Sequence, residues 1–140
     1  MVELVIYPDS TELARAMLLQ ELPSQGITGV PVGSKAIGGK PMPSRYIRVY
    51  AIPGREVCLR TQWCQIVAKT YDTDEKRCAD TAMKVAAILR AAPEIVINGD
   101  QKVSEPCELH GPFPTSDPDV PSYSVYQANL TWTLQSTVTP

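Results

Sequence analysis

Residues 122–135, SYSVYQANLTWTLQ, contain the most regular alternation of apolar and polar side chains in the chain. Successive side chains of a β-strand point to opposite faces, so the pattern predicts a strand with one apolar and one polar face. The apolar set is Tyr126, Ala128, Leu130, Trp132 and Leu134, and the polar set is Gln127, Asn129, Thr131 and Thr133. Because the polar set is uncharged, it suits a contact between subunits as well as it suits water.

A strand-to-helix unit precedes this strand. Residues 56–70 carry apolar side chains on both faces, which predicts a strand in the interior of a sheet. Asp72 and Glu75 match a capping box, which predicts a helix over residues 73–92 that Pro93 ends. The apolar stripe of this helix is Cys78, Ala82, Val85, Leu89 and Ala92.

Another amphipathic helix is predicted near the start of the chain, over residues 9–22. Asp9 and Glu12 form its capping pattern, and Pro23 stops it. Its apolar stripe is Ala14, Met17, Leu18 and Leu22. A stripe of this width needs a flat apolar partner, which a sheet supplies.

Residues 26–55 are interpreted as a hairpin of two extended stretches around a glycine-, lysine- and proline-containing tip at 33–44. Pro31 lacks a backbone donor and places the first stretch at a sheet edge. A tip of this length is expected to be mobile or functional. The tip segment GSKAIGGK lacks the order of a phosphate-binding loop, so nucleotide binding is not favoured.

The remaining segments are predicted to be short or irregular. Residues 94–100 and 102–109 are strand candidates joined by a turn at Asn98 and Gly99. Residues 106–121 are rich in proline and are expected to form a surface loop. The chain of 140 residues suits one domain, 1–140, with a single core.

Charge and cysteine usage limit the partners. The net charge is -2, so no overall positive charge favours a nucleic acid or a membrane. The segment MVELVIYPDS has no basic start and too short an apolar run for a secretion signal or a membrane span. We therefore expect a reducing cytosol, in which the four cysteines remain free thiols.

The cysteines and the single histidine are the only candidates for chemistry. Cys64 and Cys78 lie on apolar rows and are interpreted as core residues. A zinc site would need Cys107 and His110 together with Cys58 and Cys64, but their spacing lacks the paired knuckles of structural zinc sites. Cys107 and His110 could also form a thiolate pair. No catalytic, cofactor-binding or metal-binding residue is predicted.

Basic residues are concentrated in one part of the chain, whereas acidic residues such as Asp72 and Asp117 lie elsewhere. This separation is typical of a solvated hairpin face, or of a basic pole that meets an acidic partner or another copy. Opposite poles on one subunit suit head-to-tail contacts that close into rings. The basic residues of this part of the chain are Lys40, Arg45, Arg48, Arg55 and Arg60.

The order of these elements resembles the tail terminator proteins of long-tailed, siphovirus-type bacteriophages, particularly those that infect actinobacteria. The resemblance covers nearly the whole chain. It rests on the capped helix DSTELARAMLLQEL, the hairpin ending RYIRVYAIPGR, the unit RTQWCQIVAKTYDTDEKRCADTAMKVAAIL and the closing strand after PDVPSY.

The resemblance implies an α+β fold with a single mixed, largely antiparallel sheet and two main helices packed on one face. It implies a hexameric ring that caps the tail tube, stops its polymerisation and provides the docking surface for the head connector. The partners would be further copies of the chain, the major tail tube protein and head-tail connector proteins, with no membrane and no sequence-specific nucleic acid. The protein would be assembled in the host cytoplasm and reside in the neck region of the virion tail.

Such a role involves no bond-making step, so the resemblance implies neither an enzyme nor a cofactor. By the same analogy, the resemblance implies a set of predicted interface residues that would face the ring lumen, a neighbouring subunit or the tube. They are Lys35, Lys40, Arg45, Arg48 and Arg55. Two alternatives remain open. One is a head-completion or connector protein of the phage neck, and the other is a small cysteine-dependent enzyme that uses Cys107 and His110.

Overall fold

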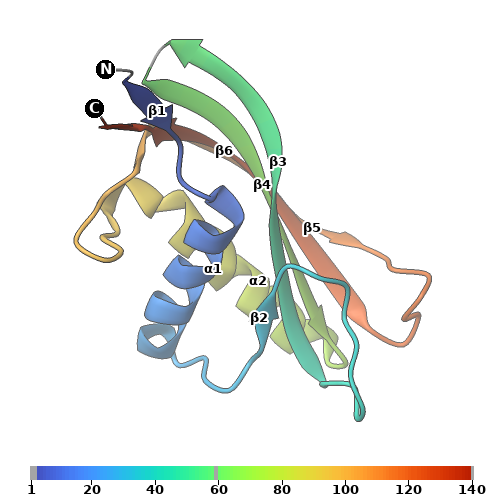
Figure 1. The fold of residues 1–140 in the computed structure, drawn as a ribbon. Coiled ribbons are helices and arrows are strands. Elements are labelled where there is room, and N and C mark those ends of the chain that lie inside the picture. Colours follow the sequence, from blue (N-terminus) through green and yellow to red (C-terminus); the bar gives the residue numbers. More distant parts are fainter. Residues whose placement is uncertain (1–2, 59, 140) are drawn as a thin grey trace.

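The computed structural model describes residues 3–58 and 60–139, in which two helices pack on one face of a five-stranded sheet (Figure 1). The strands are β2 (Val32–Gly33), β3 (Arg45–Cys58), β4 (Thr61–Asp72), β5 (Val103–Thr115) and β6 (Ser124–Gln135). Their order in the sheet is β2-β3-β4-β6-β5, and every neighbouring pair is antiparallel except β2 with β3. The predicted α+β fold with a mixed, largely antiparallel sheet is confirmed.

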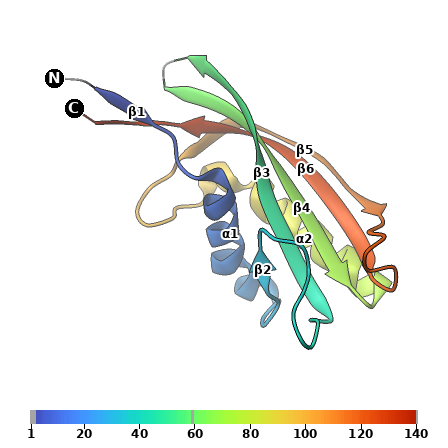
Figure 2. The same ribbon diagram turned by 45° about the vertical axis from the view of Figure 1, so that its right-hand side comes forward.

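Both helices lie on the same side of the sheet (Figure 2). Helix α1 (Ser10–Glu21) begins at Asp9, whose side chain accepts a hydrogen bond from the Glu12 N–H at 3.2 Å. This bond satisfies one of the free N–H groups of the first turn. The predicted stripe of Ala14, Met17, Leu18 and Leu22 is buried, and a 3₁₀ turn at Leu22–Gln25 ends the helix.

Helix α2 (Glu75–Arg90) is capped by Asp74, whose side chain accepts from the Arg77 N–H at 3.2 Å. The prediction of Asp72 as the cap was wrong by two residues. Asp72 is instead the last residue of β4, where it is buried and paired with arginines. The predicted stripe is buried at every position, and a second 3₁₀ turn at Ala92–Glu94 contains Pro93.

The main core lies between the helices and the sheet. Four of the five residues predicted for the apolar face of β6 enter this core, with Ala128, Leu130, Trp132 and Leu134 at 3% exposure or less. The fifth, Tyr126, is half-buried and lies outside this core. The Trp132 indole N–H donates to the Leu89 carbonyl at 3.0 Å. Carbonyls in the last turn of a helix lack partners within the helix, so Trp132 both fills the core and caps α2.

The N-terminal and C-terminal segments pair with each other outside the main sheet. Strand β1 (Leu4–Ile6) runs antiparallel to β7 (Thr137–Thr139), which places the two ends of the chain side by side (Figure 1). The sequence pattern did not predict either strand, because each is too short to show a periodicity.

The predicted hairpin over residues 26–55 was wrong. Strand β2 runs parallel to β3, with Val32 opposite Ile47 and Gly33 opposite Arg48. A tight hairpin cannot join parallel strands, so the segment at 33–44 crosses over and returns to the same end of the sheet. The edge position of the first stretch is confirmed.

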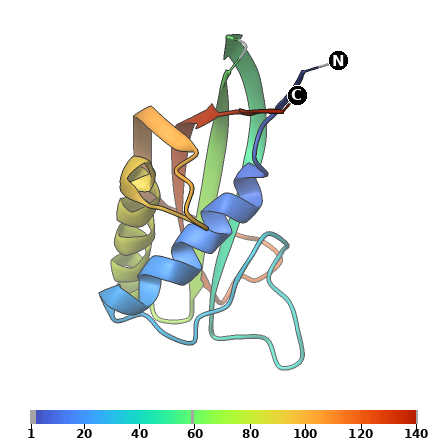
Figure 3. The ribbon, with the colours of Figure 1, turned by 60° about the vertical axis from the view of Figure 1, so that its left-hand side comes forward.

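The hairpin in the structure is formed by β3 and β4. The prediction that a strand begins at residue 56 was wrong, because β3 continues to Cys58 and β4 begins at Thr61. Strand β3 continues through Pro53 and Gly54 to Cys58, with register shifts after Pro53 and Glu56. A Cβ atom on Gly54 would collide with the Trp63 carbonyl, so only glycine fits this close approach. The closed end of this hairpin projects past α1 (Figure 3). We call residues 52–58 and 60–63 the arm.

The predicted proline-rich loop at 106–121 is only partly a loop, because β5 extends through three prolines to Thr115. Strand β5 tolerates them because it lies at the sheet edge, where a missing backbone donor breaks no bond in the sheet interior. The pairing with β6 shifts register around Pro106 and around Pro112. The predicted Asn98–Gly99 turn is present, but it joins only an isolated bridge between Ile97 and Asp100.

A second, smaller core covers one end of the sheet face that points away from the helices. It consists of Tyr71, Val120 and Val125, with Ile37, Tyr46 and Tyr123 packed around them. Hydrogen bonds link the covering loops to the sheet: the Tyr71 hydroxyl donates to Asp117 at 2.9 Å, and the Tyr123 hydroxyl donates to the Pro43 carbonyl at 2.6 Å. The crossover segment and the loop at 116–123 therefore close this end of the face.

Candidate interaction surfaces

The outer face of the sheet, which points away from the helices, carries the polar set predicted for β6. One cross-strand row consists of Ile52, Gln65, Thr131 and Glu108, and the next contains Val67, Asn129 and His110. Within residues 3–58 and 60–139, no helix lies over this face. The outer face thus combines uncharged polar side chains with a few apolar and charged ones beside the arm.

The arm carries three large exposed apolar side chains. The exposed fractions are 43% for Ile52, 47% for Val57 and 39% for Trp63. The Arg55 guanidinium carbon lies 5.5 Å from the centroid of the Trp63 ring, within the range of a cation–π contact. A projecting hairpin that keeps apolar groups in water is typical of a surface that another protein covers.

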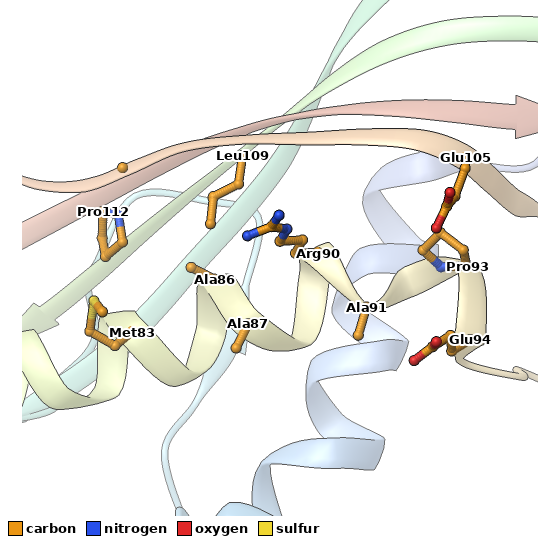
Figure 4. Close-up of a pocket in the computed structure, with 11 residues that line it drawn as sticks. Met83, Ala86, Ala87, Arg90, Ala91, Pro93, Glu94, Glu105, Leu109 and Pro112 are labelled. Atoms are coloured by element: carbon orange, nitrogen blue, oxygen red, sulfur yellow. The ribbon is translucent and has the colours of Figure 1, made fainter.

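A groove of about 440 Å³ lies between α2 and β5 (Figure 4). Met83 and Pro112 lie at one end of this α2/β5 groove, and Glu94 and Glu105 lie at the other. Arg90 lies between the two ends. Met83 is 61% exposed, although it is a large apolar residue on a helix. The groove therefore has an apolar end and an acidic end.

The predicted interface residue Arg45 belongs to an internal ion-pair cluster. Its Nε lies 3.3 Å from Asp72, and its NH2 group donates to the Thr81 hydroxyl at 2.8 Å. Arg77 makes two hydrogen bonds of 2.8 Å to the same carboxylate. Arg45 and Asp72, which lie in separate basic and acidic parts of the sequence, are thus adjacent in space. Through Asp72 and Thr81, Arg45 stabilises the packing of α2 against the sheet.

The Asp72 carboxylate is 1% exposed. Burial acts to raise its pKa, but hydrogen bonds from Arg77 and from the Asp74 N–H, with the charges of Arg77 and Arg45, outweigh burial and hold the pKa below its ordinary value. Asp72 therefore remains ionised at neutral pH. The Asp72 carboxylate stabilises the fold, and because Arg45 and Arg77 already bind it, we do not assign it to a ligand site.

The other predicted interface residues are spread over two regions. Lys35 and Lys40 are exposed in the crossover segment. Arg48 lies on the outer face, where its Nε donates to the Ser34 carbonyl at 3.1 Å and its guanidinium stacks 4.7 Å from the Tyr50 ring centroid. Arg55 lies on the arm. The five residues do not form one pole.

The structure separates the cysteines and the histidine that could have formed a site. Cys107 points into the helix-covered side, where its thiol lies 3.8 Å from the Leu89 carbonyl, whereas His110 lies on the outer face against Phe113. Cys58 lies on the arm and Cys64 in the core. No group of three metal-binding side chains gathers within the described residues. Neither the thiolate pair nor the zinc quartet is brought together.

The four thiols differ strongly in environment. Burial raises the pKa of Cys64 and of Cys78 to about 11, and it also raises the pKa of Cys107. Cys58 is exposed, and a hydrogen bond with the Thr61 side chain is the main cause that lowers its pKa. The prediction that Cys64 and Cys78 are core residues is confirmed.

We expect one fast-reacting thiol per dissociated chain near neutral pH, because thiolate content and exposure both favour Cys58. The measurement is the rate of maleimide labelling in dilute solution, followed by intact mass. The Cys58→Ser variant should lose the fast phase. A fast phase that survives in this variant would show that the arm does not expose Cys58 as described.

Sequence reasoning missed the α2/β5 groove and the arm. The groove forms only when α2 packs beside β5, and the pattern assigned much of β5 to a loop. Met83 lies outside the apolar stripe of α2, and this exposed apolar residue was the one sequence feature that could have indicated the groove. No helix of residues 3–58 and 60–139 has the length and apolar character of a membrane span. Neither a protein-family model nor a curated protein matches this chain.

Proposed function

We propose that this chain is a structural subunit of a phage tail neck, which forms a closed homo-oligomeric ring on the tail tube. The ring stops tube polymerisation and offers its free surface to the head connector. The observation that carries this proposal is the arm, because a projecting hairpin with three exposed apolar side chains gains stability when a partner covers it.

Two further observations support an assembly role. Both helices cover one face of the sheet, which leaves the opposite face available for contacts along β3, β4 and β6. The residues with catalytic potential, Cys107 and His110, lie on opposite faces of β5. The arrangement supports contact with other proteins better than it supports a thiol-dependent reaction.

The test adds the purified chain to polymerising tail-tube subunits and, in a parallel sample, to purified heads. We expect tube length to fall as the ratio of chain to tube subunit rises, and we expect added density at one tube end in negative-stain images. Tubes of unchanged length and bare ends would contradict the proposal. Binding to heads but not to tubes would assign the chain to head completion instead.

A further inference from the structure

The edges of the sheet disfavour assembly by strand addition. At the β5 edge, Pro106, Pro112 and Pro114 lack backbone donors, and the ladder shifts register twice. At the β3 edge, the Ala51 N–H points away from β4 and donates to Thr11. Pro53, two residues later, would present its backbone nitrogen on the same side and has no N–H. Proline at exposed edges blocks pairing with another strand, so subunits should meet through side chains.

The arm and the α2/β5 groove are two different surfaces of one subunit, since the groove lies between α2 and β5 and the arm is the closed end of the β3–β4 hairpin. The arm belongs to the β3–β4 hairpin, whereas β5 forms the far edge of the same sheet (Figures 1 and 2). A ring of identical subunits needs two different complementary surfaces on each copy, since each subunit contacts its neighbours head to tail. The arm and the groove supply two different surfaces on each copy.

The two surfaces also match in character. The arm presents Ile52 and Val57 together with the basic residues Arg55 and Arg60, and its Glu56 accepts a hydrogen bond from Tyr7 at 3.0 Å. The α2/β5 groove presents Met83 and Pro112 at its apolar end and two glutamates at its acidic end.

The charges of the groove act on the nearby Cys107 thiol but form no ion pair among the described residues. Neither Arg90 nor Glu94 nor Glu105 has a side-chain hydrogen bond or ion pair among residues 3–58 and 60–139. The groove therefore has an excess of one negative charge, while the arm has an excess of one positive charge from Arg55 and Arg60 over Glu56. This complementarity favours another copy of the chain as the occupant.

We propose that the arm of one subunit docks in the α2/β5 groove of the next, and that this head-to-tail contact closes the ring. The inference rests on the proposed ring function and names the contact that builds it. The apolar side chains Ile52 and Val57 pack against Met83 and Pro112, while Arg55 approaches the acidic end of the groove.

The experiment uses one variant for each surface, Val57→Asp on the arm and Met83→Glu in the groove. Each substitution places an unpaired carboxylate in the contact, so each alone should lower the affinity of the contact at least tenfold. In native mass spectrometry, each variant alone should then appear mainly as the monomer. An equimolar mixture should yield a 1:1 dimer, because the intact arm of the Met83→Glu chain can still enter the intact groove of the Val57→Asp chain. Neither chain can extend that dimer.

The matched control is Leu19→Glu, a charge placed at an equally exposed apolar residue of α1 that does not line the groove. This variant should form rings as the unmodified chain does. Far-UV circular dichroism checks the fold of each variant, and Arg55→Glu replaces Val57→Asp if the latter is unfolded.

The possible failures are distinguishable. Normal rings from both Val57→Asp and Met83→Glu would overturn the arm-groove contact, would leave the groove to another occupant, and would leave the proposed function standing. A mixture that stays monomeric or reassembles whole rings would also overturn this contact. An unmodified chain that is monomeric, even with tubes present, would overturn both the contact and the ring function.

Discussion

Replacing Trp132 with alanine is expected to lower the free energy of unfolding by about 3–5 kcal/mol. The ring is fully buried in the main core, and its indole N–H satisfies the Leu89 carbonyl near the end of α2. The variant thus leaves a cavity and removes the indole N–H from the Leu89 carbonyl, which keeps the longer contact with the Cys107 thiol at 3.8 Å. Since a domain of this size is stable by about 5–15 kcal/mol, much of its stability would be lost. The measurement is urea denaturation followed by far-UV circular dichroism.

The second tryptophan provides a matched control. Trp63 is 39% exposed on the arm and contacts Arg55 instead of the core. The Trp63→Ala variant should lower the free energy of unfolding by no more than about 1 kcal/mol. Equal losses for the two variants would contradict the division between a helix-covered core and an exposed arm. The comparison needs equal protein concentrations, because assembly itself stabilises the folded subunit.

Replacing Asp72 with asparagine is expected to lower the free energy of unfolding by about 2–3 kcal/mol at neutral pH. The substitution keeps the size of the side chain but removes the charge that binds Arg77 and Arg45. Breaking a buried pair leaves charge without its partner, and the cost falls below the usual range for buried pairs because both arginines are partly exposed. The Asp80→Asn variant, on the exposed side of α2, should change stability by no more than about 0.5 kcal/mol.

The loss in Asp72→Asn should depend on pH. The folded-state pKa of Asp72 lies below its unfolded value, so its ionised form stabilises the fold above the unfolded pKa of about 3.9. That stabilisation disappears as the pH falls through the folded-state pKa. The difference between the unmodified chain and Asp72→Asn should therefore be full near pH 7 and should shrink in strong acid. A difference that is constant with pH would mean that the charge of Asp72 does not stabilise the fold.

Local patterns in the sequence were sufficient for the elements that form the main core. The stripes of α1 and α2 and the alternation in β6 were confirmed, because each element buries one face and its residues follow the matching period. The cap of α2 was placed two residues early, since Asp72 and Asp74 both precede the helix. Only the ion pairs of Asp72 with Arg45 and Arg77 distinguish the two aspartates.

The pairing of strands was harder to predict, because it depends on partners far away in the chain. The direction of β2 follows from the path of the crossover segment, which the composition of residues 33–44 does not reveal. Prolines in β5 indicated a loop, although an edge strand with shifted register accommodates them. The same error concealed the groove, since one of its walls is formed by residues of β5.

The predicted interface residues show the limit of reasoning from charge order. Arg45 satisfies Asp72 inside the molecule, and Arg48 is held by Ser34 and Tyr50. Of the five, Arg55 is the one that lies on the arm. We propose the exposed apolar groups of the arm, rather than the basic residues as a set, as the surface that another subunit contacts.

Native mass spectrometry of the unmodified chain, across a range of protein concentrations, is the most direct test of the claim that this fold exists to assemble. The account predicts one closed oligomer with a single subunit number. The proposed tail-neck function predicts that this number is six. A monomer at every concentration, with tail tubes present or absent, would contradict it.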